Sequence, residues 1–136
     1  MNAPRTLEQL LDVVRALVLL QGAILVAATI EALIWGSAFG GGAATAVPSA
    51  AAAAALLVAR ANVGNERRWA RRVLFVVEGA LIATIAIDGA LALLITRALP
   101  PATALVTRLL IPLAVIALLR RARAAAAAAP LAAAAA

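Results

Sequence analysis

The chain of 136 residues contains no cysteine, no histidine and no tyrosine. Without cysteine there are no disulfides, iron–sulfur clusters or thiolate chemistry. Without histidine there is no imidazole acid–base catalysis and no His-ligated haem, zinc or copper. Aromatic residues make up only 3% of the chain, which argues against an aromatic cage or a stacking platform. We therefore expect no cofactor and no bound metal.

Catalytic and nucleic-acid chemistry are also poorly supported. The only serines are Ser37 and Ser49, and without a base beside them neither forms a nucleophile pair, so we expect no enzymatic activity. Lysine is absent, and arginine alone carries the net charge of +6. In a soluble protein this charge would suggest a nucleic-acid partner. Here the arginines cluster between hydrophobic runs, so membrane topology explains them better and no nucleic-acid partner is expected.

What the chain has in excess is apolar surface. Hydrophobic residues are 66% of the total, more than a soluble domain of this size could bury. They form runs about as long as a bilayer is thick. The sequence therefore predicts an all-α integral membrane bundle of four helices, at about 13–35, 43–59, 73–96 and 102–119. The abundance of alanine and arginine without lysine fits a GC-rich bacterial genome, and so the inner cell membrane.

Three regions follow from these runs. Residues 1–12 form a short cytoplasmic segment, 13–123 the transmembrane domain, and 124–136 an Ala-rich tail. The run at 43–59 is almost entirely alanine, which inserts weakly, so a half-inserted segment is the alternative to a full span there. Small residues do permit close helix contact inside a membrane, which favours a helix shielded by its neighbours.

Charge sets the expected orientation. Two arginines, Arg97 and Arg108, fall on one side of the predicted bundle. Ten fall on the other: Arg5, Arg15, Arg60, Arg67, Arg68, Arg71, Arg72, Arg120, Arg121 and Arg123. Because positive residues concentrate in cytoplasmic loops, we expect a multi-pass protein with both termini and the middle loop in the cytoplasm.

Sliding the chain on itself by 57 residues reveals a match between the first and third runs. Arg15 to Ile24 superimposes on Arg72 to Leu81, so that Gln21 lies over Glu78 and Glu31 over Asp88. The second and fourth runs match poorly. The match predicts two tandem helical hairpins related by an axis along the membrane normal. Chance resemblance between hydrophobic helices is the alternative.

Charged residues inside a membrane are rare and usually face protein or water. Glu31, Asp88 and Arg108 lie toward the predicted outer half, so we expect Arg108 to pair with Asp88, with Glu31 as the rival partner. One interpretation is a proton- or cation-coupling site, because desolvation favours the protonated form of a carboxyl group. The alternative is an interhelical salt bridge, or side chains that snorkel to the headgroups.

Gln21 and Glu78 lie nearer the cytoplasmic side. Each stands ten residues from the acidic residue on its own helix, which is about 15 Å along the axis. They predict either a polar seam or ordinary interhelical hydrogen bonds. The cluster Arg67, Arg68, Arg71 and Arg72 predicts a topology determinant or a site for anionic lipid headgroups. Gly22, Gly79 and Gly89 predict close helix packing.

These features support three hypotheses about function. The first is a non-catalytic accessory or scaffold subunit of a larger membrane complex, which would have a membrane-protein partner or form a homo-oligomer in the lipid bilayer. The second is a small oligomeric transporter or channel coupled to protons or cations through intramembrane carboxylates. Its layout is similar in topology to the small multidrug transporters, although the aromatic residues around their glutamate are lacking. The third is a lipid-binding or sensory protein that acts through the arginine-rich loop.

Overall fold

The computed structural model describes residues 3–39, 42–63, 68–95, 97 and 102–134, and all of these except Val63 and Arg97 are helical. Helix α1 covers Ala3–Phe39, α2 Gly42–Asn62, α3 Arg68–Ile95, α4 Ala102–Leu105 and α5 Ile111–Ala134, and a π-helical turn, η1, covers Val106–Leu110. Since α4, η1 and α5 are continuous, the described residues form four helical rods. The expected all-α class is confirmed.

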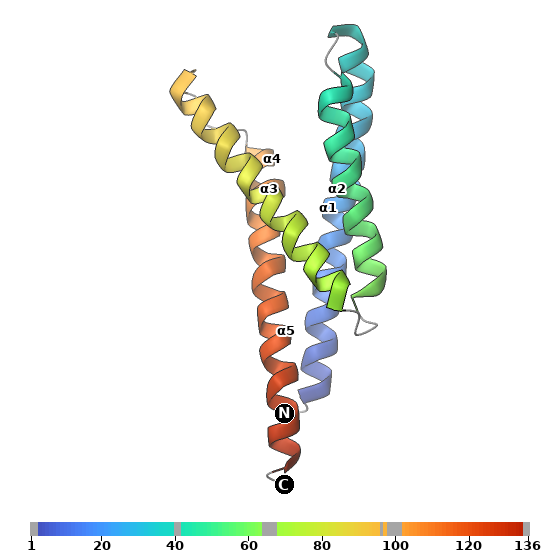
Figure 1. Cartoon of the computed structure of the whole chain (residues 1–136), viewed down its shortest axis with the longest axis vertical. Helices are drawn as coiled ribbons and strands as arrows, with labels where there is room; N and C mark the ends of the chain where they lie inside the picture. The colour runs from blue at the N-terminus through green and yellow to red at the C-terminus, as the bar shows by residue number, and fades with distance from the viewer. Residues whose placement is uncertain (1–2, 40–41, 64–67, 96, 98–101, 135–136) are drawn as a thin grey trace.

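The first two helices run antiparallel side by side over most of their length, and α5 lies along the amino-terminal half of α1 (Figure 1). Helix α3 starts near the end of α2 and crosses obliquely toward η1, so that its carboxyl-terminal half diverges from α1 and α2 (Figure 1). The amino end of α1 and the carboxyl end of α5 lie at the same end of the molecule.

Each helix buries one stripe, with spacings of three, four or seven residues that keep the buried side chains on one face of the helix. The buried hydrophobic residues are Leu11, Val14, Val18 and Leu25 on α1, Ala46, Ala53, Leu56 and Ala59 on α2, Ala70, Leu74, Leu81 and Ile85 on α3, and Ile111, Val115, Leu119 and Ala122 on α5. Small residues dominate the α2 stripe, which lets α2 approach its neighbours closely. Gly22 faces Leu57 of α2, since a Cβ on Gly22 would lie 3.1 Å from Leu57 Cδ2.

The helices extend beyond the expected boundaries. Helix α1 has 37 residues, about 55 Å, and so projects past both ends of the run 13–35. Helix α5 continues through the described part of the Ala-rich tail, to Ala134, because alanine has the highest helix propensity. Arg97 adopts a left-handed conformation with φ of 54° just after α3, a common way for a helix to end.

Two helices are long and apolar enough to cross a membrane, at Leu7–Ile34 and Arg68–Ile95. A core helix of a soluble protein would be mostly buried. In these two helices only 22% and 28% of the most apolar 18-residue stretch is buried inside the molecule. The outward faces carry large apolar side chains such as Ile34, Val76 and Leu94. Helix α2 contributes a shorter apolar stretch, Ala46–Asn62.

Candidate functional site

The two most deeply buried polar side chains in the described residues contact each other. Gln21 on α1 and Glu78 on α3 are 1% and 0% exposed, and Gln21 Nε2 donates a hydrogen bond of 3.0 Å to Glu78 Oε2. These are the positions that the 57-residue offset superimposes. We call this contact, together with the Thr107 carbonyl described next, the polar node.

The π-helical turn supplies the third member of the node. Pro112 has no N–H and its ring clashes with the carbonyl four residues earlier, and a wider turn immediately before it relieves that crowding. Ile111 N–H bonds to the Val106 oxygen, and Pro112 cannot offer the corresponding π-type bond to Thr107. Gln21 Nε2 donates a hydrogen bond of 3.3 Å to the Thr107 oxygen. The amide group thus uses both of its protons on two acceptors.

Two oxygens of the node have no hydrogen-bond partner among the described residues, Gln21 Oε1 and Glu78 Oε1. Both are buried, and an unsatisfied buried acceptor is unfavourable by about 1–3 kcal/mol. These two oxygens can therefore accept a hydrogen bond from a hydroxyl group or coordinate a small cation, and Glu78 Oε1 can also take up a proton.

A groove lies next to the node, between α1 and α2 on one side and α3 and η1 on the other. Its volume is about 240 Å³, and Asp88 and Arg108 line it together with Leu25, Leu81 and Ser49. Arg108 Nη1 lies 3.6 Å from Asp88 Oδ2, with the two side chains 36% and 60% exposed. Leu25 and Leu81 are one helical turn from Gln21 and Glu78, so an apolar layer separates the groove from the node.

The structure places Glu31 apart from this group. It is exposed on α1 and does not line the groove, so the reading that made it a rival partner of Arg108 is wrong. Because α3 diverges while α1 stays packed on α2, equivalent positions on α1 and α3 meet different surroundings. Gly79 shows the same effect, since a Cβ there would meet nothing within 4 Å, whereas Gly22 is tightly packed.

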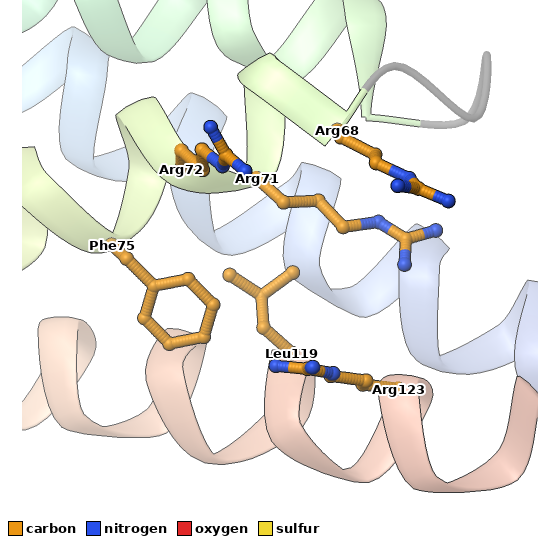
Figure 2. Close-up of a pocket in the computed structure, with 6 residues that line it drawn as sticks. All are labelled: Arg68, Arg71, Arg72, Phe75, Leu119 and Arg123. Atoms are coloured by element: carbon orange, nitrogen blue, oxygen red, sulfur yellow. The ribbon is translucent and has the colours of Figure 1, made fainter. Parts of the chain in front are cut away.

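The basic cluster forms a second site at the cytoplasmic end expected from the sequence. Arg68, Arg71 and Arg72 of α3 surround a cavity of about 510 Å³ with Arg123 of α5. Phe75 and Leu119 form its apolar wall, with Phe75 projecting from α3 and Leu119 from α5 into the space between the two helices (Figure 2). We call this the basic pocket. Arg67, also expected in the cluster, lies outside the described residues.

Sequence reasoning missed Arg123 as a member of the pocket, because it lies about fifty residues along the chain from the other three. One feature of the sequence could have linked Arg123 to the apolar residue Leu119 of the pocket. Leu119 and Arg123 are four residues apart, which places them on the same face of a helix.

Within the described residues, no group of three or more metal-ligating side chains converges. The polar groups that do converge can exchange hydrogen bonds, protons or ions, and the basic pocket can bind an anion. No protein-family model, curated protein or solved structure matches this chain.

Proposed function

We propose that the chain is a small, non-catalytic, multi-pass membrane protein that serves as an accessory or scaffold subunit of a larger membrane complex. In this proposal the four rods form a transmembrane bundle in the inner membrane with both termini in the cytoplasm. Two observations support this location. Two long helices have apolar stretches of which only 22% and 28% are buried, and the arginines concentrate on one side of the predicted bundle.

The observation that carries the accessory role is the exposure of Glu31 on an otherwise apolar face of α1. Ile30 and Ile34 next to it are 53% and 62% exposed, and Leu20, about three turns earlier on the same face, is 52% exposed. In the described residues Glu31 forms no ion pair. A carboxylate that faces lipid is strongly unfavourable, and such residues almost always face protein or water. We therefore propose that a partner transmembrane helix covers this face and places a lysine or arginine opposite Glu31.

The test is gentle detergent extraction of the tagged full-length protein, with mass spectrometry of what co-purifies. We expect a stoichiometric membrane partner that is lost from the Glu31→Gln variant and kept by the control Glu8→Gln, an exposed acid near the start of α1 that precedes the apolar run at 13–35. A Glu31→Lys variant should recover the partner once the partner's basic residue is changed to glutamate. Equal recovery of the partner with both single variants would refute this role.

A second candidate is a small proton- or cation-coupled transporter or channel, acting as an oligomer. The polar node favours it, because buried acceptors with spare capacity lie one apolar layer from a groove that holds Asp88 and Arg108. In this case the protein should purify alone as a stable homo-oligomer. Glu78→Gln and Asp88→Asn should then abolish uptake into proteoliposomes while the helical content is kept.

We also propose that the chain arose by duplication of a helical hairpin. Helix α1 contacts α2 and α5, and α3 contacts α5 and α2, as two hairpins related by a twofold axis would. Equivalent positions approach each other only near such an axis, and Gln21 and Glu78 are hydrogen-bonded.

A further inference from the structure

Four arginines on two helices line the cavity of the basic pocket. None of its six lining residues is acidic. In the described part of the chain the ion pairs involve Arg15 and Arg108, and neither lines this cavity. We propose that the pocket binds the phosphate of an anionic phospholipid headgroup.

The positive charge around the pocket favours binding of an anion from outside the chain. Four like charges around one cavity repel each other, which raises the local affinity for an anion. The cavity also lies at the amino-terminal end of α3, where the helix carries partial positive charge. Guanidinium groups suit a phosphate well, because their N–H groups form two parallel hydrogen bonds with its oxygens.

The apolar wall selects a lipid over a free anion. Phe75 follows Arg71 and Arg72 along α3, and Leu119 precedes Arg123 along α5, so both lie toward the apolar middle of their helices. A phospholipid bound here would place its phosphate among the guanidinium groups and the start of its acyl chains against Phe75. Inorganic phosphate would use only the arginines. This step rests on the membrane location proposed above.

Topology alone does not require this arrangement. Arg120 and Arg121 precede Arg123 on the same helix and are exposed, and they lie outside the cavity. They would serve the positive-inside rule equally well. They also give a matched control, since replacing Arg120 and Arg121 removes two positive charges, as many as replacing Arg71 and Arg123.

Trp69 provides a local reporter because it is adjacent to Arg68 and 41% exposed. The full chain carrying Trp35→Phe, which leaves Trp69 as the only tryptophan, is reconstituted into phosphatidylcholine vesicles. Brominated phosphatidylglycerol or brominated phosphatidylcholine is then added in increasing amounts, and quenching of Trp69 gives their relative affinity at constant ionic strength. A second arm adds millimolar inorganic phosphate to the outside and inside of the vesicles.

We expect brominated phosphatidylglycerol to quench at lower content than brominated phosphatidylcholine. Arg71→Gln with Arg123→Gln should lower that preference by up to about 30-fold, while Arg120→Gln with Arg121→Gln should retain it. Equal loss in both double variants, or no preference in the parent, would overturn the site. Loss of the preference with inorganic phosphate would assign the pocket to a soluble anion instead. If neither brominated lipid quenches Trp69, the membrane location itself fails.

Discussion

Replacing Gln21 by leucine should destabilise the bundle, although leucine is close to glutamine in size. The substitution removes both hydrogen bonds of the amide, 3.0 Å to Glu78 Oε2 and 3.3 Å to the Thr107 oxygen. An interhelical hydrogen bond in a membrane contributes about 0.6 kcal/mol on average and at most about 1.7 kcal/mol. A buried acceptor left without a donor is unfavourable by about 1–3 kcal/mol. Replacing Gln21 also removes its unpartnered Oε1, which offsets part of this cost. We therefore expect a net loss of about 1–3 kcal/mol in the free energy of unfolding.

The double variant Gln21→Leu with Glu78→Leu gives the decisive comparison. Removing both partners of a buried hydrogen bond can be nearly neutral. In the double variant neither buried carboxylate oxygen remains, and of the two acceptors that Gln21 served only the part-buried Thr107 oxygen is left. The double variant should therefore be more stable than the sum of the single losses predicts, by about 1–2 kcal/mol.

Equilibrium unfolding in mixed micelles with increasing sodium dodecyl sulfate, followed by tryptophan fluorescence, measures these differences. Glu8→Gln is the control, since Glu8 is exposed near the start of α1, and it should change stability by less than about 0.5 kcal/mol. A Gln21→Leu variant as stable as the parent, or strictly additive losses in the double variant, would refute the polar node.

Two further predictions concern packing and backbone. Gly22→Leu should lower stability by about 1–3 kcal/mol in the same unfolding assay, because a Cβ on Gly22 would lie 3.1 Å from Leu57 Cδ2. Gly79→Leu is the control and should be tolerated, because a Cβ there would meet nothing within 4 Å. Equal losses in the two variants would contradict the close approach of α1 and α2. Pro112→Ala restores an N–H and should tighten η1 into an α-helix, which would move Arg108 away from Asp88. Spin labels at positions 88 and 108 should report a changed distance, whereas Pro48→Ala, at a proline inside α2, should leave it as it was.

Much of the secondary structure could be predicted from the chain alone. Runs of apolar residues about as long as a bilayer is thick indicated the four rods. The helices α1, α2 and α5 continue beyond the apolar runs, because polar and alanine residues also form helix, which hydropathy does not report. Hydropathy also gave no sign of η1, which depends on Pro112 and its neighbours.

The candidate sites were foreseen only in part. Depth along the helices paired Arg108 with Asp88, and the structure has them 3.6 Å apart. Depth could not distinguish Glu31 from Asp88, since that choice depends on how each helix is rotated about its axis. The 57-residue offset aligned Gln21 with Glu78, and interhelical hydrogen bonds were one of two expectations for them, but their bond to each other requires α1 and α3 to approach at that level.

The sequence by itself determined that the chain is helical and apolar, that few polar residues interrupt its apolar runs, and that its arginines concentrate on one side. These are local properties, governed by side-chain chemistry and by the helical period. Only the tertiary structure decided that Gln21 meets Glu78, that Glu31 faces outward, and that Arg123 joins three arginines of α3. Such contacts join residues on different helices, and they depend on crossing angles and rotations that arise from the packing of all the helices together.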